Sequence, residues 1–368
     1  MKKNNVKIML LGWLLLFLGQ PSPLFADYTM MCTFSSNPEA RVFKVSDEGA
    51  ITFDYNLRLT EVHEPMQIEF APNGRWGLVG YDSGSTPETQ LATILKIDEN
   101  YQISVLGSVH NEYYSLVAIS PDSKYGVFGQ NLQTLRYYTD NTYDVVPTEN
   151  SYLAGLYADF SSLSGNLMAN AGWPGEKISE FKILPDGRIT GTGVVVDISP
   201  SSGFQGLKVS PDGRTCIVIN TGDYRITSLR INELGGFSIA QQFNSVSANV
   251  SDIGFTPDSR YVFISFIDPE DGNIRSYAIN PDSTLTLVQA LSLGNDCGED
   301  MAVTPDGKFA ITRHLYFSRS YFNVVRINHD GTMEYLPEND YMDINPVSDM
   351  EFVPPIITSS RDLWMNYE

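Results

Sequence analysis

The chain has 368 residues, a formal net charge of −20 at pH 7, 29 glycines and 20 prolines, a composition that favours strands and turns. A strongly acidic surface repels phosphate backbones and anionic lipid headgroups, which argues against nucleic acid and anionic membranes as partners. Three cysteines are too few for a disulfide framework, and a chain of this length buries a large core without one.

The first 26 residues have the pattern of a secretory signal peptide. Three lysines lie among the first seven residues, an apolar run follows over residues 8–19, and a small-residue cleavage site ends at Ala26. The run is too short to be a convincing membrane span, and no later segment is apolar for 18 residues. We expect a mature chain from Asp27, located in the periplasm or secreted, with no membrane insertion; a lipid anchor at Cys32 is a minor alternative.

One motif recurs along the rest of the chain. It is an apolar strand, then Ser/Thr/Ala-Pro-Asp/Asn-Gly/Ser, a basic residue and a second apolar strand. Proline sets the backbone at the first turn position, Asp or Asn hydrogen-bonds nearby backbone, and Gly or Ser tolerates the reversal. Successive copies lie about 42–50 residues apart, the length of one four-stranded blade. Clear copies begin at Phe70, Ile119, Val209, Phe255 and Val303, and degenerate copies begin at Phe160 and Phe352.

A second motif, a hairpin, alternates with the first. Seven times the chain shows two strands of alternating apolar residues around a turn of Asp, Asn or Gly, from VFKVSDEGAITF to VRINHDGTMEYL. One such sheet cannot bury its own faces, whereas seven packed radially bury them against each other. The sequence therefore predicts an all-β fold with a single domain over residues 27–368, a seven-bladed β-propeller with four-stranded blades.

The strand order also predicts how the ring closes. The chain opens with strands at residues 28–34, 40–45 and 50–53, which match the second, third and fourth strands of a blade. It ends with an inner strand at residues 347–353. We expect the N-terminal strands and this C-terminal inner strand to form the last blade, since this closure removes a free sheet edge. The alternative is a six-bladed ring with an independent hairpin.

The paired motifs resemble those of the YVTN-repeat and lactonase-type seven-bladed propellers, a group that includes 6-phosphogluconolactonase. The resemblance covers essentially the whole mature chain and implies the fold, while propellers of one architecture host many functions. In that family an Arg-His pair on the inner strand faces the tunnel mouth and handles an anionic substrate. No blade has this pair here, which argues against phosphogluconolactonase activity; the matching positions are Met66-Gln67, Ser115-Leu116, Gln205-Gly206, Ser251-Asp252, Glu299-Asp300 and Ser348-Asp349.

Three aspartates form the candidate metal site. Asp252, Asp300 and Asp349 fall at the same position of three successive inner strands, so a ring brings them close together. Carboxylates around a narrow tunnel repel one another unless a cation or a proton intervenes, and oxygen ligands suit calcium or magnesium (Ca2+ or Mg2+). One hypothesis is a divalent cation at these residues. The alternative is that each aspartate accepts hydrogen bonds from backbone N–H groups of the neighbouring blade.

The loops that lead into the inner strands should converge at the tunnel mouth. His63 and His110, the latter close to Glu112, open two adjacent blades, and a His–carboxylate pair can act as a general base. Capping of the loops by hydrogen bonds is the alternative for these three residues. The candidate ligand-binding residues at the mouth are Tyr113, Tyr152, Asn249, Glu299 and Asn345.

Two classes of function are compatible with these patterns. The first is a monomeric extracytoplasmic binding or scaffold protein whose mouth loops take a protein, a small molecule or a carbohydrate. The second is a lactonase-like hydrolase with a divalent cation in the tunnel. An enzyme needs a cavity in which acid, base and substrate can meet, so the shape of the tunnel separates the two classes.

Overall fold

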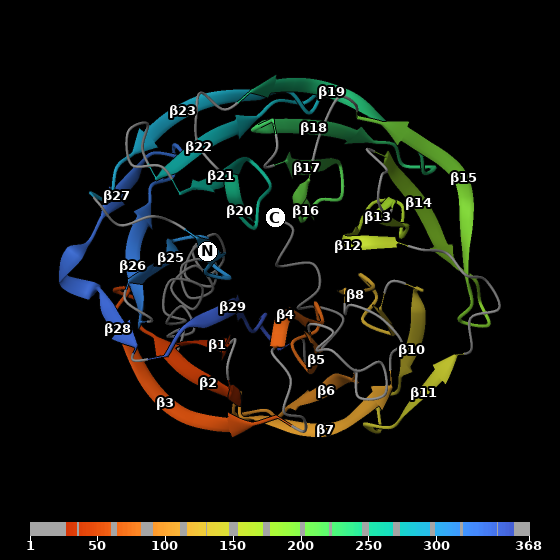
Figure 1. The fold of residues 1–368 in the computed structure, drawn as a ribbon, viewed down its shortest axis with the longest axis horizontal. Helices are drawn as coiled ribbons and strands as arrows, with labels where there is room; N and C mark the ends of the chain where they lie inside the picture. Colours follow the sequence, from red (N-terminus) through yellow and green to blue (C-terminus); the bar gives the residue numbers. More distant parts are fainter. Residues whose placement is uncertain are drawn as a thin grey trace, which may run out of the picture.

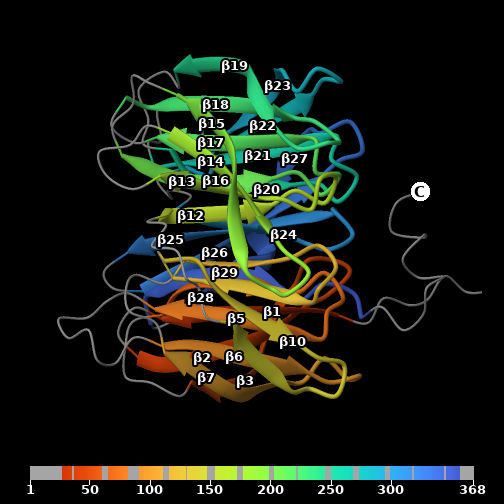
Figure 2. The ribbon, with the colours of Figure 1, turned by 90° about the vertical axis from the view of Figure 1, so that its right-hand side faces the viewer.

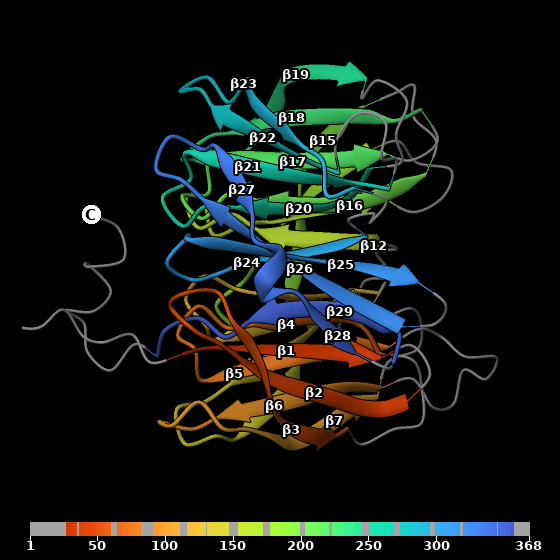
Figure 3. The same cartoon turned by 90° about the vertical axis from the view of Figure 1, so that its left-hand side faces the viewer.

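Seven twisted sheets stand around a central axis, which confirms the predicted seven-bladed propeller (Figure 1). Side views show the strands of all blades running between the two ends of the ring (Figures 2 and 3). The computed structural model describes residues 27–34, 37–59, 65–81, 91–110, 116–129, 131–146, 154–171, 177–198, 203–220, 223–244, 250–267, 273–294, 299–316, 319–343 and 345–356.

Consecutive strands run from the tunnel outward in the first six blades. Blades 1 to 3 are β4 (Pro65–Phe70), β5 (Trp76–Tyr81), β6 (Leu91–Ile97) and β7 (Ile103–His110); β8 (Val117–Ile119), β9 (Tyr125–Phe128), β10 (Gln133–Tyr137) and β11 (Tyr143–Val146); and β12 (Ala154–Phe160), β13 (Leu167–Ala171), β14 (Lys177–Ile183) and β15 (Ile189–Asp197). Blades 4 to 6 are β16 (Phe204–Val209), β17 (Thr215–Asn220), β18 (Arg225–Ile231) and β19 (Phe237–Asn244); β20 (Val250–Phe255), β21 (Tyr261–Phe266), β22 (Ile274–Ile279) and β23 (Leu285–Leu291); and β24 (Asp300–Val303), β25 (Phe309–Tyr316), β26 (Arg319–Ile327), β27 (Met333–Tyr335) and β28 (Tyr341–Asp343).

The seventh blade joins the two ends of the chain. Its order from the tunnel outward is β29 (Val347–Phe352), β1 (Tyr28–Phe34), β2 (Asn37–Val45) and β3 (Ile51–Arg58). In the ladder between β1 and β29, Cys32 lies opposite Met350. The predicted closure is therefore confirmed, and the third and fourth strands are longer than the sequence suggested.

The recurring Pro-Asp turn is built by side chains as well as backbone. In blade 4 the Ser210 hydroxyl donates to Asp212 Oδ1 at 2.6 Å, and the Thr215 N–H donates to Ser210 Oγ at 3.0 Å. Gly213 has a φ of +72°, and a Cβ at this position would lie 2.2 Å from the backbone nitrogen of Leu163 in blade 3. The motif thus reverses the chain and also sets the close packing of one blade on the next.

Packing between adjacent blades forms the core. Trp76 of blade 1 stacks on Tyr137 of blade 2 with ring centroids 4.7 Å apart, and its indole N–H donates to the Ser123 carbonyl at 2.9 Å. Between blades 6 and 7, Phe43 packs against Phe322. Seven such buried clusters alternate with the sheets, as expected for units that bury their faces only against neighbours. None of the described helices is long and apolar enough to cross a membrane.

Blade 6 departs from the predicted four strands. Its outer strand is split into β27 and β28, which both pair with β26, and a short 3-10 turn at Pro337–Asn339 lies between them. Proline cannot donate to a sheet ladder, which explains the interruption. The split carries Asp343 to Arg41 of blade 7, where the two side chains form an ion pair across the blade boundary.

Candidate binding site in the central tunnel

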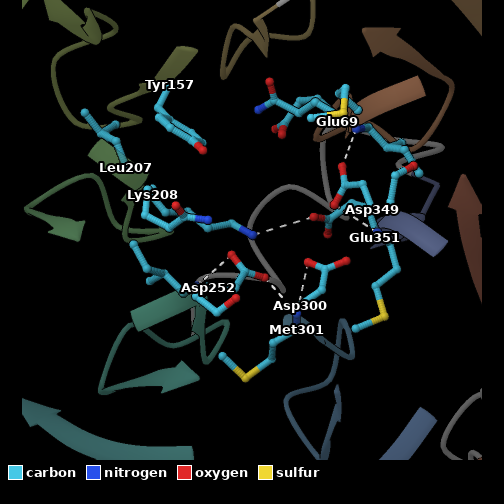
Figure 4. A pocket seen from close by; sticks show the side chains of 18 of the residues that line it. Glu69, Tyr157, Leu207, Lys208, Asp252, Asp300, Met301, Asp349 and Glu351 are labelled. Carbon is cyan, nitrogen blue, oxygen red and sulfur yellow. Dashed lines mark hydrogen bonds and ion pairs between the residues drawn. The ribbon is translucent and has the colours of Figure 1, made fainter. Parts of the chain in front are cut away.

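A cavity of about 450 Å³ occupies the tunnel and is lined by residues from all seven blades. Because strand side chains alternate between faces, every second residue of an inner strand points into this space. Most of the charged lining side chains are labelled in Figure 4, and we group them into two tiers by their position along the inner strands. We define the first tier as Asp252, Asp300 and Asp349, and the second tier, two residues further along the inner strands, as Glu69, Asp159, Lys208 and Glu351.

The structure brings the three predicted aspartates together in the first tier. Asp252 accepts the N–H of Ile253 at 2.7 Å and that of Met301, on the next inner strand, at 2.8 Å. Asp349 accepts the N–H of Met350 at 2.8 Å and that of Ile68, on the inner strand of blade 1, at 2.5 Å. These two aspartates therefore show the backbone-binding arrangement that the sequence left as an alternative.

The inner strand of each blade needs side-chain acceptors for its backbone N–H groups. One of its edges pairs with the second strand, and the other faces the tunnel, where a backbone N–H would have no sheet partner. Gln67 binds such an N–H on the next inner strand: its Oε1 accepts the N–H of Val117 at 3.2 Å, as Asp252 accepts that of Met301. Asp159 accepts the N–H of Val209 at 2.7 Å in the same way. The tunnel side chains thus connect blades to each other.

Asp300 differs from its two partners in the first tier. Its Oδ1 accepts the N–H of Met301 at 3.1 Å, and its Oδ2 has no hydrogen-bond partner among the described residues. The residue is only 8% exposed. Its Oδ2 lies 3.9 Å from Arg313 Nε, and Arg313 Nη1 lies 3.1 Å from Glu299. Burial, followed by the neighbouring Asp349 and Asp252, raises the pKa of Asp300 well above its ordinary value.

The second tier has an ammonium among its carboxylates. Lys208 Nζ lies 3.6 Å from Glu351 Oε2, and the 35% exposure of the lysine side chain is exposure to the tunnel space. Burial opposes its charge, but Glu351, Asp252, Glu69 and Asp159 outweigh that effect and raise the pKa of Lys208. Lys208 is therefore protonated at neutral pH and acts as an internal counterion.

Burial also shifts the tunnel carboxyls toward their neutral forms. It raises the pKa of Asp159 to about 6 and the pKa of Asp349 to about 8, with hydrogen bonds from the backbone opposing the shift in both. The pKa of Glu69 rises well above its usual value because of burial and of the charges on Asp159 and Glu351. Around neutral pH the tunnel therefore holds exchangeable protons.

The divalent cation remains a prediction. Within the described ranges, no group of three or more His, Cys, Asp or Glu side chains is arranged so that it could hold a metal ion. Metal binding would need carboxylate oxygens that converge at about 2.3–2.6 Å on one point. Asp252 and Asp349 instead direct both oxygens at backbone N–H groups.

The structure places the other predicted site residues differently. Glu299 lines the cavity, as expected of a residue at the mouth. Asn345 is not among the lining residues, and its backbone N–H donates to Asp343 at 3.0 Å. His110 ends β7, and its side chain lies outside the described part of the chain. Also outside the described residues lie His63, Glu112, Tyr113, Tyr152 and Asn249.

The sequence reasoning did not identify Lys208, Glu69, Asp159 or Glu351 as site residues. The signal was present for three of them, because Glu69, Lys208 and Glu351 each lie two positions after a residue compared between blades, and period-2 alternation turns them to the same side. What the sequence could not give is which opposing side chains meet across the tunnel.

Comparison with known proteins identifies the fold. No protein-family model and no curated protein sequence matches the chain. Among solved structures, a protein of Bacteroides fragilis described as a putative 6-phosphogluconolactonase matches with a TM-score of 0.74 and 17% identity, covering 91% of this chain and 100% of that one. The periplasmic gluconolactonase of Pseudomonas aeruginosa matches with a TM-score of 0.71 and 17% identity, covering 89% and 99%.

The chain has the fold of the 6-phosphogluconolactonase-like seven-bladed propellers. The structural likeness confirms the resemblance inferred from the paired motifs. At 17% identity a lactonase-like propeller shares the architecture of these proteins, while its chemistry must be argued from its own tunnel.

Proposed function

We propose that this lactonase-like propeller is an extracytoplasmic binding protein that takes a small ligand into the mouth of its central tunnel. The observation that carries the proposal is the cavity of about 450 Å³, which falls within the usual size of small-molecule sites. Its wall combines the charged tiers with apolar side chains, including Met66, Leu116, Tyr157 and Met301. The N-terminal signal pattern supports the extracytoplasmic location.

The arrangement of the lining residues favours binding over catalysis. Covalent catalysis needs an activated nucleophile beside a base. Lys208 is held protonated by its carboxylate neighbours, which makes it a poor nucleophile. Asp252 and Asp349 are tied to the backbone of adjoining blades, an arrangement that gives a preformed and rigid wall.

A plugging variant tests this proposal. Met66 lines the cavity and is 50% exposed, so Met66→Trp narrows the tunnel without disturbing a buried site. Sugars, sugar acids, amines and short peptides are screened by thermal shift on residues 27–368, and each hit is titrated calorimetrically. We expect hits to lose affinity in Met66→Trp and to keep it in the control Leu234→Trp, since Leu234 is fully exposed on blade 4. Hits that bind both variants equally would place the site elsewhere.

A lactonase-like hydrolase is the second candidate, because burial raises the pKa of Asp349 to about 8 and a carboxyl that keeps its proton near neutral pH can act as a general acid. A structural relative is a gluconolactonase, so gluconolactone is the substrate to try. Hydrolysis is followed with chelator and with calcium or magnesium. A rate above background that Asp349→Asn removes would favour the hydrolase, and a cation requirement would support a metal at the first tier.

A further inference from the structure

The charges around the cavity do not balance locally. Among the described lining residues the only cationic side chains are Lys208 and Arg313. Lys208 faces Glu351, and Arg313 is closest to Glu299 at the rim. The second tier therefore has its own ammonium, whereas the first tier has only the guanidinium of Arg313 beside it, whose Nε lies 3.9 Å from Asp300 Oδ2, beyond hydrogen-bond distance.

Asp300 shows where the missing partner would sit. Its Oδ2 is buried and lacks a hydrogen bond from any described residue, and Figure 4 shows the side chain directed into the cavity beside Asp252 and opposite Asp349. A buried carboxyl oxygen without a hydrogen bond is costly, so the position favours a donor with positive charge. Asp252 and Asp349 can contribute as well, because each of their carboxylate oxygens has two lone pairs and accepts one hydrogen bond from a backbone N–H.

We propose that the first tier binds the ammonium or guanidinium group of a small organic cation, whose apolar part lies against Met66, Tyr157 and Met301. This inference rests on the proposed function and names the chemical class of its ligand. Charge-assisted N–H···O contacts of about 2.7–2.9 Å form without disturbing the backbone bonds of the aspartates. The face of Tyr157, which lines the same cavity, can add a cation–π contact.

Two competing ligand classes fit the tunnel less well. An anion such as a sugar acid would meet seven lining carboxyl groups and only two cations, Lys208 and Arg313, which already face carboxylates, and like charges disfavour that placement. A divalent metal ion would require carboxylate oxygens to converge on a point, whereas those of Asp252 and Asp349 are directed at backbone N–H groups.

Three probes that share one hydrocarbon body isolate the effect of charge. Residues 27–368 are titrated calorimetrically at pH 8 with 2-phenylethylammonium, with neutral 2-phenylethanol and with the anion 3-phenylpropionate. The ammonium is expected to bind at least about 10-fold more tightly than the other two, the size of one charge-assisted hydrogen bond. Asp300→Asn should weaken ammonium binding by about 10-fold or more.

Matched variants separate the effect of Asp300 from that of net charge or folding. Asp186→Asn removes one carboxylate from an exposed turn between β14 and β15 and should leave ammonium binding unchanged. Asp300→Asn removes a buried carboxyl group whose Oδ2 has no hydrogen bond, so the thermal midpoint at pH 8 should not fall, which shows that the variant is folded.

The outcomes distinguish this inference from the proposed function. If 3-phenylpropionate binds and Met66→Trp removes that binding, the tunnel is a ligand site but not one for cations. Equal ammonium affinity in wild type and Asp300→Asn overturns the assignment to the first tier. Calcium chloride that binds more tightly than the ammonium makes a metal ion the occupant instead. If none of the probes binds and no screen hit depends on Met66, the proposed function itself fails.

Discussion

Gly213 shows how one residue connects a turn to blade packing. Its φ of +72° suits glycine, and an added Cβ would meet the Leu163 backbone at 2.2 Å. Gly165 has nearly the same φ, +70°, with nothing within 4 Å of a Cβ. We expect Gly165→Ala to lower the free energy of unfolding by about 1 kcal/mol and Gly213→Ala to lower it by clearly more. Urea unfolding of both variants measures the difference, and equal losses would mean that blade contact at Gly213 contributes nothing.

Lys208 is the second residue whose removal gives a clear expectation. Lys208→Met leaves Glu351, Glu69 and Asp159 without their ammonium. The variant should lose about 2 kcal/mol of unfolding free energy at pH 8, less than for a fully buried pair because the lysine is exposed to the tunnel. Adding Glu351→Gln to Lys208→Met should recover part of the loss. No recovery in the double variant would show that the two side chains do not interact.

At the residue scale, the sequence predicted part of the site. Equivalent positions in the repeats were enough to bring Asp252, Asp300 and Asp349 together. The distinct role of Asp300 could not be predicted, because it depends on which backbone N–H groups of a neighbouring blade come within reach. Such distances are set by the packing between blades, not by local sequence.

The closing strand is the element on which the ring depends. β29 pairs with β1 and supplies Asp349 and Glu351 to the tunnel. A chain that stops at Asn345 leaves the edge of β1 unpaired and should aggregate or lose its folded monomer, because an open sheet edge recruits other strands. A chain that stops at Ile356 keeps β29 and should remain folded. Size-exclusion chromatography with circular dichroism compares them, and a folded monomer from the shorter chain would contradict the closure.

The strands that flank clear turn motifs could be predicted from the sequence, and the irregular outer strand of blade 6 could not. The seven hairpins and the Pro-Asp turns gave the number of blades and the closing register. The sequence did not predict that the outer strand of blade 6 is split. Pro337 marks the interruption, but a proline can simply end a strand, and nothing local shows that a second strand, β28, then pairs with the same neighbour, β26.

For the whole molecule, the raised pKa values of the tunnel carboxyl groups determine whether stability rises or falls with pH. Asp159 and Asp349 have folded pKa values of about 6 and about 8, above those of unfolded aspartate, so the folded state binds more protons. Stability from these groups is therefore present at low pH and is lost as pH rises from about 4 to 8. Turn aspartates such as Asp122 and Asp258 have a lowered pKa, so their effect on stability is opposite. The stability that they contribute is lost as pH falls below about 4.

The thermal midpoint should therefore be highest near about pH 5 and fall toward pH 8. Asp300→Asn should flatten this decline, because the raised pKa of Asp300 contributes to it. Asp186→Asn replaces an aspartate on an exposed turn instead and should keep the wild-type profile. Scanning calorimetry from pH 4 to 9 gives the three profiles, and parallel curves for both variants would show that repulsion over the whole acidic surface, rather than the tunnel, causes the decline.

The affinity for an organic cation should also depend on the protonation of the tunnel carboxyl groups. Asp300 is faced by Asp252, Asp349, Arg313 and, at the rim, Glu299, and a bound ammonium favours the ionised carboxyl groups. The alkylammonium probe keeps its own charge from pH 5 to 8. Affinity should therefore rise with pH over this range, in contrast to the stability of the free protein.

A crystal structure of residues 27–368 soaked with 2-phenylethylammonium at pH 8 tests the central claim most directly. We predict density for the probe in the tunnel, with its nitrogen within hydrogen-bond distance of Asp300 Oδ2 and its ring toward Tyr157. Density for the probe only outside the tunnel, or a metal ion between Asp252, Asp300 and Asp349 in its place, would contradict it.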